Sequence, residues 1–398
     1  MRKLGNILLL MTALLAAVSC IYDFNPDLQG RGGVLVVEGD ILIGDFTVVR
    51  ISRSMDLTTD VTAGRHFEHV SASCFVEASD GTVYGNGSSR IDTRPADPSL
   101  EYRLVVRTET GEYVSEWARP LRASAIDSLS YSISPDATTM WVEVSAHGER
   151  DNIYYRWIGE ETWEYHAPFH ATHYFVPRGT IHRGEVMPRD TVVAYEHGED
   201  AYFCWRSGVV NSVLVASTGD LSENRLVRHR LYSMDRYDQK ISYLYSVDLT
   251  QEALSEAAYK YWTLLEKNSN DVGGLFSPEP MEMRGNIVNV NDPEEMVLGY
   301  VSVTVPARTR YFIVSHDTSF PRTRRSDYDY EPVYVLKKDW RRYYGNNYDV
   351  YMEHNADDPG RDQQANDEFD WLPARCVKCW LWSSGTKNKP SYWPNDDK

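Results

Sequence analysis

Three histidines lie close together near the middle of the chain, at spacings of four and three residues. On a helix, His166, His170 and His173 would share one face and could bind a metal ion through their imidazole nitrogens. Pro168 and the many neighbouring aromatic residues favour a strand or a loop instead. We therefore interpret this segment as a solvated, aromatic-rich loop and predict that it holds no metal.

Two cysteines near the C-terminus, Cys376 and Cys379, are separated by two residues. This spacing occurs in redox pairs, in halves of zinc sites and in structural disulfides. The following residues do not indicate the helix start of a thioredoxin-like motif, and no further ligands stand at a recognisable zinc spacing. We predict a structural disulfide between Cys376 and Cys379. The alternatives are a bond from one of them to Cys204, and metal or redox chemistry; the pairing of Cys74 and Cys204 stays open.

An acidic stretch near the C-terminus could offer oxygen ligands to calcium. It runs from Asp357 to Asp370, inside a segment from 346 to 370 that is polar and poor in apolar residues. The stretch lacks the glycine at position six and the glutamate at position twelve of the helix-loop-helix calcium loop. We interpret residues 346–370 as a long, solvated surface loop.

The sequence lacks the patterns that commonly mark an enzyme. It has no Gly-x-Ser-x-Gly turn, no serine or cysteine with an obvious histidine partner, and no Gly-x-x-x-x-Gly-Lys phosphate loop. The paired carboxylates of glycoside hydrolases are distant in sequence, and nothing points to such a pair. We expect a protein without catalytic activity or cofactor, with a hydrolase as the alternative.

The first nineteen residues have the features of a secretory signal peptide. Arg2 and Lys3 are basic, the run from Ile7 to Leu15 is apolar, and small residues precede Cys20. The apolar run is too short to span a bilayer. A cysteine directly after small residues can take a diacylglyceryl group once the signal is cleaved. We predict a lipoprotein signal over 1–19 and lipidation of Cys20; the alternative is an ordinary secreted protein.

A polar, glycine-rich segment over 20–32 follows the predicted cleavage point and would serve as a tether. No other stretch approaches eighteen apolar residues, so the lipid would be the only attachment to the outer membrane, with the protein at the cell surface. The net charge is −17, and loss of Arg2 and Lys3 with the signal would leave −19. Nucleic acid is excluded as a partner because its binding needs a basic footprint.

The region from 33 to 123 alternates short β-branched runs with turn signals. Gly44-Asp45, Asp80-Gly81 and Gly111 each separate two such runs, which predicts three hairpins. About seven short strands at this regular spacing are typical of an immunoglobulin-like β-sandwich. We therefore predict that this sandwich forms the N-terminal domain.

The remainder, from 124 to 398, is predicted to be a second, larger β-rich domain that ends in the segment with the two spaced cysteines. Apolar and polar residues alternate from Ile126 onward, as in a sheet with one solvated face. A helix is predicted over 251–267, because Thr250 suits the N-cap and Glu252 suits the first turn. The apolar stripe that would pack on a sheet consists of Leu254, Ala257, Ala258, Tyr261, Trp262 and Leu265. The fold class is therefore mainly β, with one amphipathic helix.

Several short motifs occur in a distinctive order along the chain. They are Cys20, Leu35–Gly39, Tyr259–Trp262, Leu275–Pro280, Gly285–Ile287, Val297–Tyr300, Cys376–Cys379 and Tyr392–Trp393. This ordered set, spanning residues 20 to 394, resembles the Bacteroidota outer-membrane lipoprotein family known as domain of unknown function 4249. The resemblance implies an N-terminal β-sandwich, a larger β-rich part and no established catalytic residues. It also implies a frequent genomic neighbour that encodes a TonB-dependent transporter.

The resemblance and the predicted anchor suggest a surface lipoprotein that works with a TonB-dependent outer-membrane transporter in nutrient capture. An adhesin or structural surface protein is the alternative, because β-sandwiches also serve protein contact.

The predicted anchor can be tested at Cys20. Replacing Cys20 with Ala removes the only thiol that could carry the lipid, so the variant should leave the membrane fraction and appear with the soluble proteins. Fractionation and immunoblotting of wild type and Cys20→Ala measure this. A Cys74→Ala variant is the matched control and should stay in the membrane fraction. Persistent membrane attachment of Cys20→Ala would contradict the lipoprotein prediction.

Overall fold

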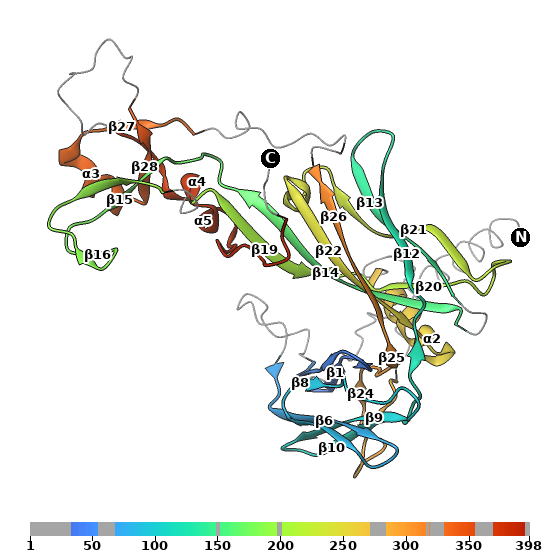
Figure 1. Ribbon diagram of the computed structural model, residues 1–398. Coiled ribbons are helices and arrows are strands. Elements are labelled where there is room, and N and C mark those ends of the chain that lie inside the picture. Colours follow the sequence, from blue (N-terminus) through green and yellow to red (C-terminus); the bar gives the residue numbers. More distant parts are fainter. Residues whose placement is uncertain are drawn as a thin grey trace, which may run out of the picture.

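The fold is mainly β, as the sequence predicts, with several sheets and few helices. Figure 1 shows three bodies, which we call the N-terminal, central and C-terminal bodies, and the central one lies between the other two. None of the helices in the described part of the chain is long and apolar enough to cross a membrane. The computed structural model describes residues 33–54, 68–148, 152–196, 201–270, 284–315, 318, 330–354 and 369–394.

The N-terminal body contains eleven strands from the first part of the chain, packed around one apolar core. The pairs β6–β7 and β9–β10 confirm two of the predicted hairpins. The strands are β1 (Leu35–Glu38), β2 (Ile41–Leu42), β3 (Phe46–Val48), β4 (Arg50–Arg53), β5 (Glu68–His69), β6 (Ala72–Ala78), β7 (Val83–Gly87), β8 (Arg90–Asp92), β9 (Tyr102–Thr108), β10 (Glu112–Ser115) and β11 (Leu121–Arg122).

Three strands from much later in the chain complete the N-terminal body. They are β23 (Ile287–Asn289), β24 (Val297–Leu298) and β25 (Val303–Val305). β24 runs parallel to β1, β23 runs antiparallel to β10, and β25 lies between β2 and β11. The prediction that 124–398 forms one separate domain is therefore wrong for this segment, whose apolar side chains fill the N-terminal core. The immunoglobulin-like strand order stays a prediction.

The central body consists of two sheets packed face to face around the second apolar core (Figure 1). One sheet has the order β12-β13-β21, and the other has the order β19-β14-β22-β26 with β20 also paired to β14. The strands are β12 (Ile126–Ile133), β13 (Thr139–His147), β14 (Tyr154–His166), β19 (Phe203–Val209), β20 (Leu214–Ser217), β21 (Arg225–Asp235), β22 (Leu244–Ala253) and β26 (Ala307–Val314).

The helix α2 (Glu256–Asn270) begins five residues later than predicted. Ser255, not Thr250, caps it: the Ser255 hydroxyl accepts a hydrogen bond from the Ala258 N–H at 3.2 Å. Thr250 and Glu252 belong to β22, where Thr250 pairs with Ile158 of β14. The strand continues because its alternate side chains are buried in the central core, and this tertiary burial outweighs the local capping signal.

A buried ion pair joins the N-terminal body to the central sheet. The Arg156 guanidinium lies 2.5 Å from Asp40 and 3.2 Å from Glu252, and it stacks on the Trp262 ring at 3.6 Å. Asp40 also accepts a hydrogen bond from the Ser302 N–H at 2.8 Å. Burial, followed by the nearby Asp40 charge, raises the pKa of Glu252 above its ordinary value. One arginine therefore connects β14, β22, α2 and the N-terminal body.

The C-terminal body combines two distant parts of the chain around two smaller apolar clusters. The predicted surface loop over 346–370 is wrong at both ends, because β28 and β29 pair there and bury Val350 and Phe369. The elements are β15 (His173–Val176), β16 (Ile181–His182), β17 (Glu185–Val186), β18 (Thr191–Ala194), β27 (Val333–Val335), the 3-10 turn η5 (Lys337–Asp339), α3 (Trp340–Gly345), β28 (Tyr348–Glu353), β29 (Phe369–Pro373), α4 (Ala374–Val377) and α5 (Cys379–Ser383).

The disulfide joins Cys204 to Cys379, with the two Cα atoms 5.6 Å apart. The predicted bond between Cys376 and Cys379 is therefore wrong, and the alternative pairing with Cys204 is confirmed. The two neighbouring cysteines enter different cores: Cys379 lies with Cys204 in the central core, and Cys376 is a free thiol in a cluster of the C-terminal body. A backbone hydrogen bond holds Cys379 beside the segment that leads to Cys204: the Cys379 N–H donates to the Ala201 carbonyl at 2.9 Å.

Two glycines allow backbones to cross where the late strands enter the N-terminal body. Gly299 has φ +123°, and a Cβ there would lie 2.0 Å from the Val37 carbonyl oxygen. A Cβ on Gly285 would lie 1.5 Å from the Gly299 carbonyl oxygen. Only glycine fits at either position, because these neighbouring atoms belong to the backbone and cannot move aside cheaply.

Gly299→Ala should therefore lower the free energy of unfolding by more than about 2 kcal/mol, through steric overlap and backbone strain together. Urea denaturation of purified protein measures the change. Gly345→Ala is the matched control, since a Cβ there meets no atom within 4 Å, and it should change stability by less than about 0.5 kcal/mol. Equal stabilities of the two variants would contradict the crossing.

Candidate functional site

A cleft lined mainly by aromatic side chains lies where β14 ends, between the central and C-terminal bodies. Its cavity is about 300 Å³, at the small end of the range for ligand pockets. The aromatic residues that line this aromatic cleft are Tyr165, Phe169, Tyr202, Tyr237, Tyr243, Tyr351 and Trp382, and its polar residues include His166, His170, Gln239 and Ser242. They come from β14, the segments before β19 and β22, the 3-10 turn η2 (Gln239–Ile241), β28 and α5.

His166 is the most constrained polar residue of the cleft. Its side chain is 9% exposed, its ring stacks on Tyr243 with centroids 3.4 Å apart, and Nε2 lies 2.7 Å from Glu164 Oε1. The buried Nδ1 has no hydrogen-bond partner among the described residues. If Nε2 carries the proton and donates to Glu164, Nδ1 keeps a lone pair that can accept a hydrogen bond. A ligand donor that reaches Nδ1 would complete the bonding of this ring.

Glu164 fixes the histidine from behind and is itself fixed by the C-terminal segment. Its second oxygen accepts a hydrogen bond from the Trp393 indole N–H at 2.9 Å. Burial of the Glu164 carboxyl acts to raise its pKa, but hydrogen bonds from His166 and Trp393 outweigh burial and hold the pKa below its ordinary value. Glu164 therefore stays ionised at neutral pH and orients the His166 ring.

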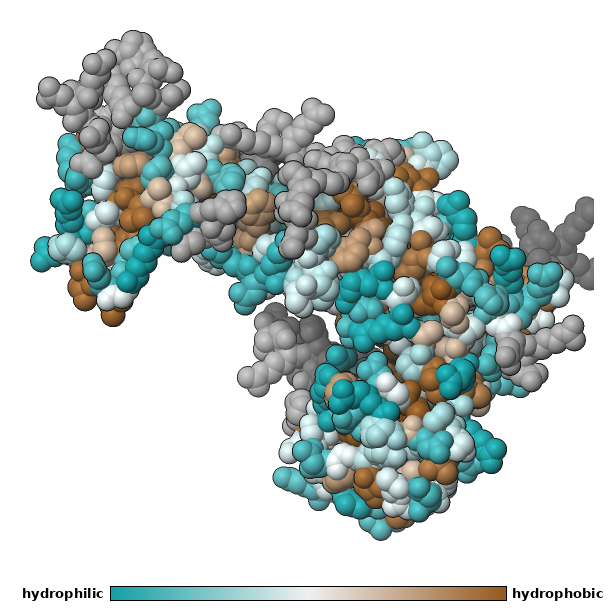
Figure 2. All heavy atoms as spheres, in the orientation of Figure 1, coloured by the Kyte–Doolittle hydropathy of each residue, from teal (hydrophilic) through white to brown (hydrophobic). Residues whose placement is uncertain are grey.

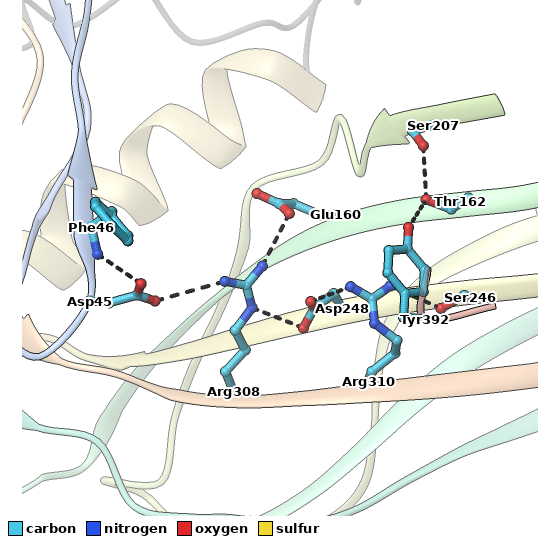
Figure 3. Close-up of polar contacts among 10 residues, drawn as sticks. All are labelled: Asp45, Phe46, Glu160, Thr162, Ser207, Ser246, Asp248, Arg308, Arg310 and Tyr392. Carbon is cyan, nitrogen blue, oxygen red and sulfur yellow. Dashed lines mark hydrogen bonds and ion pairs between the residues drawn. The ribbon is translucent and has the colours of Figure 1, made fainter. Parts of the chain in front are cut away.

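Tyr392, next to Trp393, is held against the outer face of the central sheet (Figure 3). Its hydroxyl lies 2.9 Å from Thr162 Oγ1, and the Arg310 guanidinium stacks on its ring at 3.7 Å. Figure 3 also shows Arg308 and Arg310 sharing the Asp248 carboxylate, at 3.0 and 2.5 Å. These charges are paired with one another, so the network holds the segment in place and offers little to a ligand.

The rim of the cleft presents flat and exposed aromatic surface. His170 stacks on Tyr202 with centroids 4.3 Å apart, and Tyr237 is 75% exposed beneath the Arg236 guanidinium. No Asp, Glu, Lys or Arg is found among the described residues that line the cavity. Aromatic faces with hydroxyl and imidazole groups suit a small neutral ligand that has a flat apolar face and polar edges.

The sequence profile of one protein family, described as Domain of unknown function (DUF4249), matches residues 21–310. The chain belongs to this family. The DUF4249 region includes His166, Tyr202 and Tyr243, whereas Tyr351 and Trp382 follow its end, as do the motifs at 376–379 and 392–393. From its sequence motifs, the chain was expected to resemble this family as far as residue 394. The family profile shows the match as far as residue 310. No curated protein matches the chain.

The other predicted site residues of this DUF4249 chain fall outside the cleft. His173 packs on Phe369 with ring centroids 5.2 Å apart, so it does not join His166 and His170. Within the described ranges, no group of three or more His, Cys, Asp or Glu side chains is placed to hold a metal ion. The interpretation of a solvated loop is wrong for His166, which ends β14 with a side chain that is only 9% exposed. The predicted signal over 1–19, the tether over 20–32 with Cys20, and residues 357–368 of the acidic stretch lie outside the described residues.

The role of Trp393 gives a pH-dependent prediction. The depressed pKa of Glu164 means that its ionised form adds stability above the ordinary pKa of a glutamate, and this stability is lost as pH falls through the folded-state pKa. Trp393→Phe removes one of the lowering hydrogen bonds, so stability at pH 7 should fall by about 1–3 kcal/mol. The deficit should shrink below pH 4, as measured by urea denaturation.

Trp371→Phe is the matched control, because Trp371 is fully buried and its indole N–H has no hydrogen-bond partner among the described residues. Its effect on stability should be the same at both pH values. A Trp393→Phe deficit that does not depend on pH would contradict the proposed bond to an ionised Glu164.

Proposed function

We propose that this chain is a lipid-anchored surface protein that binds a small neutral ligand in the aromatic cleft and does not catalyse a reaction on it. The observation that carries the proposal is the cleft itself, where His166 lies among stacked aromatic rings and its buried Nδ1 has no hydrogen-bond partner within the part of the chain that the structure describes. The proposed lipid anchor is Cys20, and the signal-peptide motif that precedes it in the sequence supports this assignment.

Binding is favoured over catalysis by how the polar groups of the cleft are used. The Tyr165 hydroxyl is committed on both sides, since it donates to the Cys379 carbonyl at 3.0 Å and accepts from the Gly385 N–H at 2.7 Å. His166 is stacked on Tyr243 and bonded to Glu164. These groups hold fixed positions and form a preformed receptor, whereas nucleophilic catalysis needs a nucleophile paired with its base.

An exposed hairpin is suited to binding a protein partner. In line with the family resemblance, we propose that this partner is a TonB-dependent transporter. The strands β16 and β17 project from the C-terminal body (Figure 1), and apolar residues appear at this tip in Figure 2. Ile181 and Val186 face each other across the hairpin and are 76% and 65% exposed. Two adjacent apolar side chains at this exposure suit insertion into a pocket of another protein.

The cleft can be tested with a panel of small neutral ring compounds, including hexoses, nucleosides and aromatic amides, screened by ligand-observed NMR. At least one should bind the wild-type chain, and its affinity should fall about tenfold or more in His166→Gln and in Tyr237→Ala. Trp117→Ala is the control, because it removes an exposed aromatic from the N-terminal body and should leave the affinity unchanged. Binding that survives both cleft variants would contradict the proposal.

The partner can be tested separately by cross-linking and affinity purification from solubilised outer membranes. The wild-type chain should recover a TonB-dependent transporter, and the double variant Ile181→Asp with Val186→Asp should recover much less because charges replace the apolar tip. Val227→Asp, also at an exposed apolar position, is the control. Failure of the wild-type chain to recover any transporter would remove this part of the proposal and leave the cleft untouched.

A further inference from the structure

A buried carboxylate lies on the outer face of the sheet β12-β13-β21, away from the aromatic cleft and its sheet. Glu143 of β13 has a side chain that is only 5% exposed, although it belongs to the face that points away from the central core. The hydroxyls of Ser130 and Ser132, on the neighbouring strand β12, both donate to it. On its other side, Glu143 meets Arg228 and Arg230 of β21.

The two arginines approach Glu143 through their Nε atoms, while much of each side chain is exposed. Arg228 Nε lies 2.7 Å from Glu143, and Arg230 Nε lies 4.0 Å from it. The Arg230 guanidinium also stacks on the Trp141 ring at 3.9 Å. The side chains are still 59% and 58% exposed, and neither guanidinium pairs with a carboxylate other than that of Glu143 among the described residues. Both guanidinium groups therefore lie beside Glu143 and present N–H donors to solvent, and Trp141 also supports Arg230.

The backbone of β21 is distorted at this place. Arg228 has φ +48°, in the left-handed region that residues with a side chain seldom adopt, and the β13–β21 register shifts between Val144 and Ala146. The Arg228 N–H donates to the Ser145 hydroxyl at 3.0 Å, outside the regular ladder. Such a bulge redirects a side chain at a cost in free energy. Arg228, at the bulge, and Arg230, two residues along the strand, both lie beside the Glu143 carboxylate.

The charge of the cluster is positive in a chain whose net charge is strongly negative. Burial acts to raise the pKa of Glu143, but hydrogen bonds from Ser132 and Arg228 outweigh it and lower the pKa, so the carboxyl is ionised at neutral pH. Two guanidinium groups and one carboxylate leave one net positive charge. Guanidinium groups bind oxyanions through pairs of N–H donors, and two of them suit the three terminal oxygens of a phosphate or sulfate ester.

We propose that Arg228 and Arg230 form a binding site for a tetrahedral oxyanion, a phosphate or sulfate group carried by a larger ligand, and that Glu143 is the positioning residue that orients both. The site is independent of the aromatic cleft and does not rest on the function proposed for it.

Isothermal titration calorimetry at constant ionic strength tests the site with inorganic phosphate, inorganic sulfate and glucose 6-phosphate, and with glucose as the uncharged comparison. At least one oxyanion should bind the full chain and glucose should not bind at this site. Arg228→Gln and Arg230→Gln should each weaken binding about tenfold. Arg225→Gln is the control on the same strand and should change affinity less than about twofold, because Arg225 lies outside the pair. Stronger binding of glucose 6-phosphate than of inorganic phosphate identifies a sugar ester as the source of the group only if Arg228→Gln removes the difference, because the sugar alone could also bind in the aromatic cleft.

Glu143→Gln separates an organised site from a merely cationic surface. The substitution makes the face more positive, so simple attraction predicts tighter binding, whereas loss of the positioning carboxylate predicts binding at least about fivefold weaker. Ser132→Ala, which keeps every charge and removes one hydrogen bond to Glu143, should weaken binding in the same direction if Glu143→Gln proves unstable. The proposal is overturned if no oxyanion binds, if Arg225→Gln weakens binding as much as Arg228→Gln, or if Glu143→Gln binds as tightly as wild type.

Discussion

The alternation of side chains along the strand β14 is the constraint on which the rest of the structure depends. Because successive residues of a strand point to opposite faces, Tyr155, Trp157, Trp163 and Tyr165 fill the central core, and the residues between them face outward. Arg156, near the start of this outer row, binds Asp40 of the N-terminal body. His166, at the other end, forms the aromatic cleft. A register shift by one residue would exchange the two faces and remove the junction and the cleft together.

The outer row of β14 is also covered along most of its length, and this covering gives the cleft its rigidity. Trp393 and the disulfide between Cys204 and Cys379 tie the C-terminal part of the chain to the central sheet. The cleft therefore has walls from segments that are far apart in sequence but fixed to one strand. A preformed cavity loses less conformational entropy on binding than one that must be ordered, which favours ligand capture with few charged contacts.

Local sequence patterns predicted most of the strands. The features that they predicted wrongly or missed depend on packing between residues distant in sequence. The hairpins β6–β7 and β9–β10 followed from β-branched runs and turn residues. The helix start predicted at Thr250 was wrong because β22 continues there, paired and buried between β14 and β26. The predicted disulfide between Cys376 and Cys379 was wrong because Cys379 enters the same core as Cys204. The cleft was missed since its residues meet only in three dimensions. The dense aromatic residues beside His166 were the one available signal, and no spacing rule links them to Tyr243 or Tyr351.

The central claim, that the aromatic cleft is the binding site, is tested most directly by a crystal structure of the wild-type chain with the tightest-binding neutral ring compound. The account predicts the ring inside the cleft, in contact with His166 and Tyr237, with the stacked pair of His166 and Tyr243 unmoved. An ordered ligand at another place on the protein, with the cleft free of it, would contradict the account.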